Sequence, residues 1–321
     1  MIAAHHSLVR LWASISVHER FCPHDVGSTM PIDIAVVPVA GHGTRLLPAT
    51  KSQPKEMLPV GRKPVVQYVV EELAQSGISR MLFVTGASKT SIENHFDIDD
   101  GLITYLRETG REDELKELDF ERRDIEYFYT RQRRQLGLGH AVLCAKSLIG
   151  SQSFVVALGD SIIGVNAKSD IVHRMVDEFE QSKADIVVAF EEVPAQDVTR
   201  YGIAKPRGEV SDRFELEDLL EKPSVDEAPS RLAVASRYIF SPAIFEALDE
   251  TEPGKGGEIQ LTDAIRILLA RGAKGVGLKL PEGERRFDIG NYGSYFRAFV
   301  DFALADPDYG DALREHLRGQ L

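Results

Sequence analysis

A basic segment with two glycines offers the clearest chemistry in this sequence. Residues 40–59 read AGHGTRLLPATKSQPKEMLP. Gly41 and Gly43 allow the backbone to approach a ligand closely and to turn its N–H groups toward phosphate oxygens. Arg45, Lys51 and Lys55 add three cations, and a charge-assisted hydrogen bond contributes about 1.5–3 kcal/mol. The segment therefore predicts a loop that binds a polyphosphate.

A surface turn with incidental basic residues is the alternative to a phosphate loop. A glycine–x–glycine after a strand is weak evidence by itself. The segment is neither a Walker A loop nor a Gly-x-Gly-x-x-Gly dinucleotide fingerprint, because Leu46 stands where the third glycine would be. The missing glycine and the three cations disfavour a nicotinamide-dependent oxidoreductase.

Two aspartates are candidate metal ligands. Asp160 follows the predicted strand Phe154–Leu158, and Asp288 lies in the Phe-Asp-Ile-Gly sequence of residues 287–290. In nucleotide enzymes Mg²⁺ typically takes one or two carboxylates, and phosphate oxygens and water complete its coordination. An aspartate before a turn is more often a cap or a turn former. The sequence positions alone leave both interpretations open.

The elements that would position these residues follow an α/β pattern. Ile32–Val39 and Met81–Val84 are short apolar runs typical of buried parallel strands. Between them Pro64 opens a helix that Gly77 closes. This βαβ unit places the basic segment at the carboxyl end of its first strand, which is where ligands bind in open α/β sheets.

The rest of the chain continues this pattern. Further predicted strands are Ile125–Thr130, Phe154–Leu158, Ala184–Phe190 and Val276–Leu280, with antiparallel or mixed strands between Tyr201 and Tyr238. Further predicted helices are Ser88–Phe96, Gly139–Ala145, Ile171–Ser182, Pro242–Leu248, Thr262–Ala270 and Tyr292–Leu304. Residues 97–124 carry many charges of both signs and predict an exposed helical excursion. One α/β domain with a smaller, elaborated C-terminal part is expected.

Composition narrows the class of protein. Of 321 residues, 43% are hydrophobic and 27% are charged, which is usual for a globular protein. The 38 Lys and Arg residues against 50 Asp and Glu residues give a net charge of −12. This argues against nucleic-acid binding, which usually needs a basic patch. Two cysteines, Cys22 and Cys144, are too few for a disulfide framework and fit a reducing cytoplasm.

The first 30 residues are predicted to be a leader, either disordered or upstream of a true start at Met30. Leu8–Val17 is weakly apolar, but Arg10 interrupts it and no small-residue cleavage site follows, which disfavours a signal peptide. No uncharged apolar stretch reaches the roughly 18 residues of a membrane span. Residues 31–321 are expected to form the folded domain, and a chain that starts at Met30 is expected to keep full activity.

Several segments together resemble the sugar-phosphate nucleotidylyltransferases and, within them, the bacterial UTP–glucose-1-phosphate uridylyltransferases. Besides the basic segment, the matching segments are KPVVQYVVEE from Lys63, SIENHFD from Ser91, GLGHAVLCA from Gly137, EKP from Glu221, GGEIQLTDAI from Gly256 and FDIGN from Phe287. They follow in the right order from Ile32 to about Leu304. The resemblance implies an α/β, Rossmann-like nucleotide-diphospho-sugar transferase fold, with a mixed, mostly parallel sheet flanked by helices.

The resemblance also implies roles for the first half of the site. Arg45 and Lys55 would hold the phosphates of the nucleotide, and Asp160 and Asp288 would bind Mg²⁺. The residues of the basic segment that the resemblance implies in substrate binding are Ala40 and Gly41, near the base, and Gly43, Thr44 and Glu56.

The sugar and the base would be bound by residues further along the chain. By the family pattern Glu221 binds the hexose, Lys222 holds its phosphate and Gly202 lies at the sugar, although a solvated pair is the commoner meaning of Glu-Lys. Gln132 and Gly137 flank a loop that resembles the base-reading segment, and a glutamine amide can donate to and accept from a uracil edge. His140 is expected to pack at the start of a helix rather than to act in catalysis.

The implied reaction is attack by glucose 1-phosphate on the α-phosphorus of UTP, with release of pyrophosphate. Catalysis would come from positioning and charge stabilisation. Two alternatives stay open, namely nucleotidyl transfer from dTTP or another nucleotide to a related sugar phosphate, and a nucleotide-sugar-binding paralogue without activity. The second would not need both metal carboxylates. The expected partners are UTP and glucose 1-phosphate, without nucleic acid or membrane, in a cytoplasmic homo-oligomer.

Overall fold

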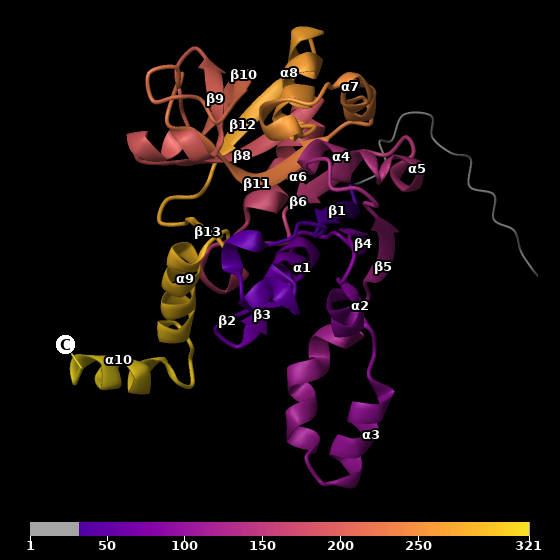
Figure 1. The fold of residues 1–321 in the computed structure, drawn as a ribbon, viewed down its shortest axis with the longest axis vertical. Coiled ribbons are helices and arrows are strands. Elements are labelled where there is room, and N and C mark those ends of the chain that lie inside the picture. The colour runs from indigo at the N-terminus through magenta and orange to yellow at the C-terminus, as the bar shows by residue number, and fades with distance from the viewer. Residues whose placement is uncertain (1–31, 321) are drawn as a thin grey trace, which may run out of the picture. The chain divides into compact units, whose positions relative to one another are not determined.

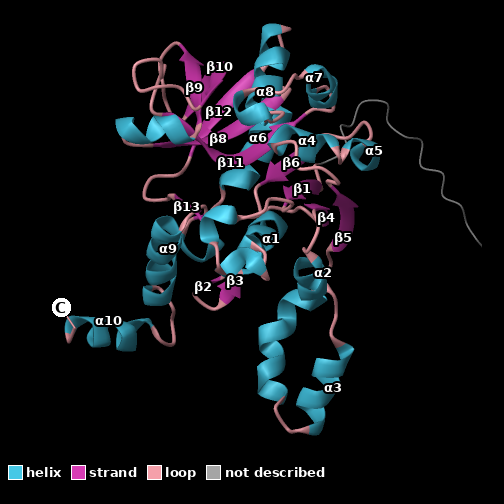
Figure 2. Cartoon of the chain, viewed as in Figure 1, coloured by secondary structure: helices cyan, strands magenta, loops and turns pink. Residues whose placement is uncertain are grey.

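The computed structural model describes residues 32–320. The predicted leader and Leu321 lie outside the described residues. A central sheet carries helices on both faces (Figures 1 and 2). In the described part of the chain, no helix combines the length and the apolar character needed to cross a membrane.

Nine strands form the central sheet. They are β1 (Ile34–Pro38), β4 (Arg80–Thr85), β5 (Glu126–Arg131), β6 (Phe154–Ala157), β8 (Ile186–Glu192), β9 (Gly202–Arg207), β10 (Arg213–Glu221), β11 (Leu232–Phe240) and β12 (Gly275–Lys279). Their order is β5-β4-β1-β6-β11-β8-β12-β10-β9. Strands β10 and β11 run opposite to the other seven strands, so every pairing that includes one of them is antiparallel. The remaining pairings are parallel. The predicted mixed, mostly parallel sheet is therefore confirmed.

Helices cover the sheet and extend beyond it. They are α1 (Val65–Gln75), α2 (Thr90–Phe96), α3 (Asp100–Glu108), α4 (Leu138–Leu143), α5 (Lys146–Ile149), α6 (Ile171–Ser182), α7 (Ile244–Glu250), α8 (Leu261–Ala270), α9 (Tyr292–Leu304) and α10 (Gly310–Arg318). The predicted excursion at residues 97–124 contains α3 and the 3-10 helix Glu112–Arg122. Figure 1 shows this excursion projecting away from the sheet.

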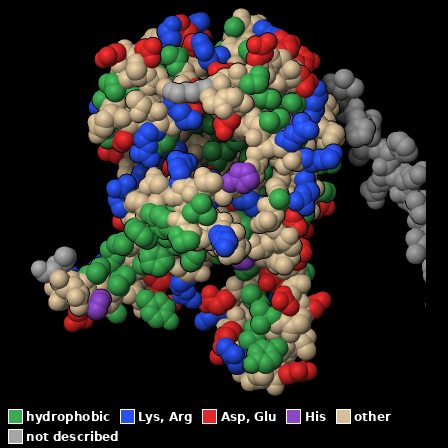
Figure 3. All heavy atoms as spheres, in the orientation of Figure 1, with side chains coloured by type: hydrophobic (Ala, Val, Ile, Leu, Met, Phe, Trp, Pro, Cys, Tyr) green, Lys and Arg blue, Asp and Glu red, His purple; other side chains and the backbone are tan. Residues whose placement is uncertain are grey.

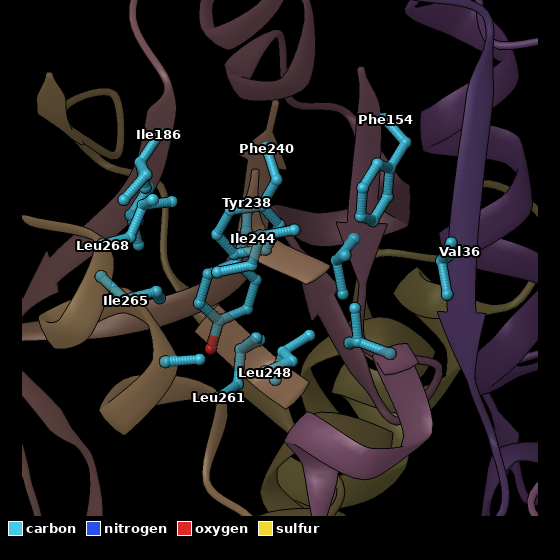
Figure 4. Packing of buried hydrophobic residues seen from close by; sticks show 14 of the residues in the cluster. Val36, Phe154, Ile186, Tyr238, Phe240, Ile244, Leu248, Leu261, Ile265 and Leu268 are labelled. Carbon is cyan, nitrogen blue, oxygen red and sulfur yellow. The ribbon is translucent and has the colours of Figure 1, made fainter. Parts of the chain in front are cut away.

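Alternate strand residues enter two hydrophobic clusters, one on each face of the sheet. In β1, Ile34 and Val36 belong to the first cluster, whereas Ala35 and Val37 belong to the second. Helices α4, α7 and α8 complete the first cluster, part of which Figure 4 shows, and α1, α2 and α6 complete the second. Strands that are buried on both faces read as nearly continuous apolar runs, which is why the sequence reveals them.

Two short antiparallel ribbons stand apart from the central sheet. One pairs β2 (Pro59–Val60) with β3 (Lys63–Pro64), and the other pairs β7 (Ser161–Ile163) with β13 (Arg286–Asp288). Phe287 of β13 contacts Phe302 of α9 edge to face, with ring centroids 5.1 Å apart. These ribbons, together with α5 and α10, are absent from the sequence-based prediction because each is short or weakly patterned.

Candidate active site

Loops from four parallel strands meet at the carboxyl edge of the sheet. They follow β1, β4, β5 and β6 and carry Ala40, Gly86, Gln132 and Asp160 respectively. Ala40 is buried, and its carbonyl accepts a 2.7 Å hydrogen bond from Nε2 of Gln135. A Cβ atom on Gly86 would lie 2.9 Å from the same carbonyl oxygen. Glycine is therefore required for these two loops to approach so closely.

The basic segment is shaped by a left-handed residue and short turns. Gly43 has φ of 66°, and its carbonyl accepts a 2.8 Å hydrogen bond from Oγ1 of Thr50. Thr44 and Arg45 follow on an exposed turn, and the charge of Arg45 lowers the pKa of Asp288, although other groups raise it more. This part of the segment is thus open to solvent, with Arg45 near enough to Asp288 to interact with it electrostatically. Its three 3-10 turns are Thr44–Leu46, Ala49–Lys51 and Lys55–Met57.

Lys55 connects the basic segment to the carboxylates. Its Nζ atom forms an ion pair with Asp160, and its Cε atom would lie 3.8 Å from a Cβ atom on Gly41. Burial opposes the charged form of Lys55, but the carboxylates of Asp160 and Glu56 raise its pKa above the ordinary value. Burial also opposes the charged form of Asp160 and by itself would raise its pKa. The positive charge of Lys55 outweighs burial, so the pKa of Asp160 is lowered. Both groups are therefore held in their charged forms.

Glu56 lies behind Lys55 in the protein interior. Its Oε2 atom pairs with Nζ of Lys89 at 2.8 Å, and both side chains are buried. Burial raises the pKa of Glu56, while the charges of Lys89 and Lys55 oppose the shift. The structure thus places this carboxylate against two lysines rather than on an open surface, so its contact with substrate stays a prediction. Lys89 was not predicted as a site residue, because no motif or spacing in the sequence singles it out.

Asp160 and Asp288 are brought together by the β7–β13 ribbon, although they are far apart in the sequence. Asp160 directly precedes β7, Asp288 ends β13, and the backbone N–H of Ile289 donates to the carbonyl of Asp160 at 3.0 Å. Burial raises the pKa of Asp288, and the negative charge of Asp160 raises it further. The two predicted metal ligands therefore lie close together, as their assignment requires.

This pair of carboxylates fits a hard divalent cation. Two like charges in a buried place disfavour each other's ionised forms, and the pKa of Asp288 is raised by burial first and by the charge of Asp160 second. A bound cation would relieve both effects. Within residues 32–320, no cluster of three or more His, Cys, Asp or Glu side chains could hold a metal alone. A site with two carboxylates matches Mg²⁺, which keeps water and substrate phosphate in its coordination sphere.

The predicted sugar-binding residues lie on paired strands β9 and β10. Gly202 is the register partner of Glu221, and Oε2 of Glu221 accepts a 2.7 Å hydrogen bond from Oγ1 of Thr262. Lys222 Nζ lies 2.9 Å from Oε1 of Glu221. The backbone of Lys222 has φ of 46°, a conformation that non-glycine residues adopt rarely and often at functional sites. Thr262 lies within one of the matched segments but was not predicted as a site residue.

The predicted base-binding residues also come together. Nε2 of Gln132 lies 3.0 Å from the carbonyl of Gly137 and 3.0 Å from Nδ1 of His140. Gly137 has φ of 105°, and a Cβ atom there would lie 2.6 Å from the carbonyl oxygen of Ile259. The amide nitrogen of Gln132 therefore stabilises the loop that connects Gln132 to Gly137. His140 packs in α4 as expected, and burial lowers its pKa.

Figure 3 shows a hollow near the centre of the molecule with Lys and Arg side chains on its rim. In the view shared with Figure 1 it lies between the region of β8 and β12 and the region of α1. This local positive rim belongs to a chain with a net charge of −12. The hollow therefore offers cations to an anionic ligand even though the chain as a whole is acidic.

Comparison with known proteins agrees with this geometry. The family model described as nucleotidyl transferase matches residues 34–303. The UTP–glucose-1-phosphate uridylyltransferase YngB of Bacillus subtilis is 43% identical over 283 residues, which cover 88% of this chain and 93% of that protein. The relatives therefore match the described chain nearly end to end.

Two solved structures have the same fold. A UTP-bound UGPase from Acinetobacter baumannii gives a TM-score of 0.81 at 36% identity and covers 89% of this chain and 98% of its own. A UDP-glucose pyrophosphorylase complexed with UDP-glucose gives a TM-score of 0.77 at 36% identity and covers 86% of this chain and 100% of its own. The expected fold is thereby confirmed. The chain belongs to the nucleotidyl transferase family, within the group of the UTP–glucose-1-phosphate uridylyltransferases.

Proposed function

We propose that this protein transfers the uridylyl group of UTP to glucose 1-phosphate and releases pyrophosphate. The observation that carries the proposal is the arrangement of Lys55, Asp160 and Asp288 at the carboxyl edge of the sheet. This arrangement gives a cation for the phosphates of a nucleotide and a carboxylate pair for a metal in one place. The names of the relatives, with UTP or UDP-glucose bound in two solved structures, support the same reaction.

The proposed reaction is a single displacement. A phosphate oxygen of glucose 1-phosphate forms a bond to the α-phosphorus of UTP, while the bond from that phosphorus to the oxygen bridging to the β-phosphate breaks. Pyrophosphate leaves with the electron pair. An ionised sugar phosphate is already a nucleophile, so no side chain is required as a general base. Lys55 and Arg45 stabilise the negative charge on the leaving group, and the basic segment holds the nucleotide through Gly41, Gly43 and Thr44.

Asp160 and Asp288 are proposed to hold Mg²⁺. When bound, the ion would neutralise phosphate charge and so favour the transfer. Lys55, held by Asp160 at one end of the site, keeps a positive charge beside the carboxylates. Glu56 is proposed to act through Lys55, because its carboxylate is buried between Lys55 and Lys89.

The acceptor is proposed to lie against β9 and β10. Glu221 accepts hydrogen bonds from hexose hydroxyls, and Gly202, its register partner, lies beside it at the sugar. Lys222 binds the sugar phosphate. On the other side, Gln132, Gly137 and the backbone at Ala40 form the base pocket, where the buried loop contacts favour a pyrimidine over a larger purine.

An exposed apolar surface on α9 bears on the oligomeric state. We propose a homo-oligomer, because α9 presents Phe296, Phe299 and Val300 at 58%, 38% and 44% exposure, and exposed apolar patches often mark interfaces. Light scattering coupled to gel filtration measures this directly, and a monomer at micromolar concentration would contradict it. A cytoplasmic location remains the prediction of the sequence.

Pyrophosphate release with Mg²⁺, UTP and glucose 1-phosphate tests the proposed reaction. Release that requires both substrates, together with formation of UDP-glucose, is the expected result. A nucleotide-sugar-binding protein without activity would bind UDP-glucose yet release no pyrophosphate. Replacing UTP by dTTP and glucose 1-phosphate by other hexose 1-phosphates separates uridylyl transfer from the related reactions.

A further inference from the structure

Arg286 of β13 has an unusual environment for an arginine. Its side chain is only 6% exposed, yet it belongs to none of the sequence-predicted sites. Nε donates to Oε1 of Glu191 at 2.7 Å, and the backbone N–H of Arg286 donates to Oε2 of the same carboxylate at 3.2 Å. The guanidinium also lies over the ring of Tyr201, 4.3 Å from its centroid. Glu191 and Tyr201 therefore fix the orientation of Arg286.

The two Nη groups of the guanidinium make few hydrogen bonds with the protein. An arginine side chain has five N–H donors. The Nε donor bonds to Glu191, and one Nη1 donor makes a 3.4 Å contact with Oγ of Ser236. Among the described residues, Nη2 donates to no acceptor. Because Nη2 donates to none of these residues and Arg286 lines a pocket, this end of the side chain is available to a ligand with acceptor oxygens.

A pocket lies at this position. It has a volume of about 200 Å³, and Arg286, Tyr201 and Asp288 are among its lining residues. Three other arginines line the pocket. Arg200 contacts Asp197 and Arg285 pairs with Asp301, so both are neutralised, and Arg297 is exposed on α9, unlike the buried Arg286.

The pocket connects the two halves of the candidate active site. Asp288 is a proposed metal ligand, and Tyr201 directly precedes Gly202, the register partner of Glu221. Arg286 therefore lies between the carboxylate pair and the sugar-binding strands. In the reaction proposed above, the group that must span these two places is the phosphate of the acceptor, because it joins the sugar to the reacting α-phosphorus.

We propose that Arg286 is a substrate-binding residue whose Nη groups donate to the phosphate oxygens of the acceptor sugar phosphate. This inference rests on the proposed function and adds to it the residue that orients the attacking group. Guanidinium is well matched to phosphate, because its planar fork can donate two parallel hydrogen bonds. A lysine at this position would supply charge but no fork.

Binding of three ligands to wild type and to Arg286→Gln and Arg286→Lys tests the inference. Calorimetry with Mg²⁺ and a non-hydrolysable UTP analogue would measure the affinity of glucose 1-phosphate, of unphosphorylated glucose, and of the analogue itself without sugar. Both variants should bind glucose 1-phosphate about tenfold or more weakly than wild type, as expected for a lost charge-assisted hydrogen bond. Glucose and the nucleotide analogue should bind as in wild type.

Several outcomes would overturn the inference. Equal weakening of glucose and glucose 1-phosphate would show that Arg286 supports the pocket rather than binds phosphate. Loss of affinity for the UTP analogue, or a shift only in the Mg²⁺ concentration needed for half-maximal activity, would assign it to the nucleotide or the metal. If Arg286→Gln does not fold, the binding test is made with Arg286→Lys alone, which keeps a cation beside Glu191.

A control variant and the wild-type protein separate this inference from the proposed function. Arg207→Gln removes the same charge from the far end of β9, where Arg207 pairs with Glu215 at 3.0 Å, and should leave all three affinities unchanged. If wild type binds neither glucose 1-phosphate nor UTP and releases no pyrophosphate, the proposed function fails. If wild type is active and both Arg286 variants bind glucose 1-phosphate normally, only the inference about Arg286 fails.

Discussion

Glu72 of α1 and Arg237 of β11 form an ion pair in which neither side chain has any solvent exposure. Two hydrogen bonds join them, from Nε to Oε1 at 3.0 Å and from Nη2 to Oε2 at 2.6 Å. Nη2 of Arg237 also donates to the carbonyl of Ser161 at 3.0 Å. Because Ser161 directly follows Asp160, the pair ties a helix and a central strand to the segment that carries a proposed metal ligand.

Breaking this pair on one side should destabilise the protein strongly. Arg237→Met leaves Glu72 buried without its partner, which typically costs about 3–5 kcal/mol. Urea denaturation followed by circular dichroism measures the change. The double variant Glu72→Leu, Arg237→Met should lose less free energy of unfolding than Arg237→Met alone, because no uncompensated buried charge remains. Arg271→Met, which breaks an exposed pair with Glu250, is the control. A loss of stability there as large as at Arg237 would contradict the argument that burial makes the Arg237 pair costly to break.

Each of the two aspartates should be essential for turnover. Asp160→Asn and Asp288→Asn keep the shape of the side chain but remove a charge from the proposed Mg²⁺ site. The metal supplies several kcal/mol of transition-state stabilisation, so kcat should fall by roughly a hundredfold or more. Steady-state assays at saturating Mg²⁺ give the answer, with the exposed Asp226→Asn as control. A loss of tenfold or less in both variants would remove them from the site.

Lys222 should act on the acceptor and not on the nucleotide. Lys222→Ala removes a charge-assisted contact worth about 1.5–3 kcal/mol, so kcat/KM for glucose 1-phosphate should drop at least about tenfold. UTP affinity measured without acceptor should barely change. An equal fall in UTP affinity would show that this lysine is wrongly assigned to the sugar phosphate.

Gly137 should be required for the shape of the base pocket. Its φ of 105° is strained for any other residue, and an added Cβ atom would lie 2.6 Å from the carbonyl oxygen of Ile259. Gly137→Ala should therefore displace the loop braced by Gln132 and raise KM for UTP, with little change in KM for glucose 1-phosphate. Gly110→Ala, which also has a positive φ but meets nothing within 4 Å, controls for backbone strain alone. Unchanged UTP kinetics for Gly137→Ala would separate this loop from the base.

The parts of the fold that sequence reasoning found are those with a local signal. The strands β1, β4 and β6 are buried on both faces, so their apolar runs and the loop after β1 were predictable. The β7–β13 ribbon was not, because its strands are three residues long and its partners are distant in the sequence. The site shows the same division. Motif residues such as Asp160 were predicted, but Lys89 and Arg286 become evident only when the fold brings Lys89 to Glu56 and Arg286 to Glu191.

The nucleotide that the protein prefers decides whether the reaction is uridylyl transfer. Purified protein with Mg²⁺ and glucose 1-phosphate should be assayed for kcat/KM with UTP, dTTP, ATP and GTP. UTP should be preferred, with strong rejection of the purines, because polar groups left unpaired in the base pocket are costly, and with weaker rejection of dTTP, which differs by one methyl group and one hydroxyl. A preference for dTTP or ATP would contradict uridylyl transfer, and no pyrophosphate release with any of the four would contradict nucleotidyl transfer itself.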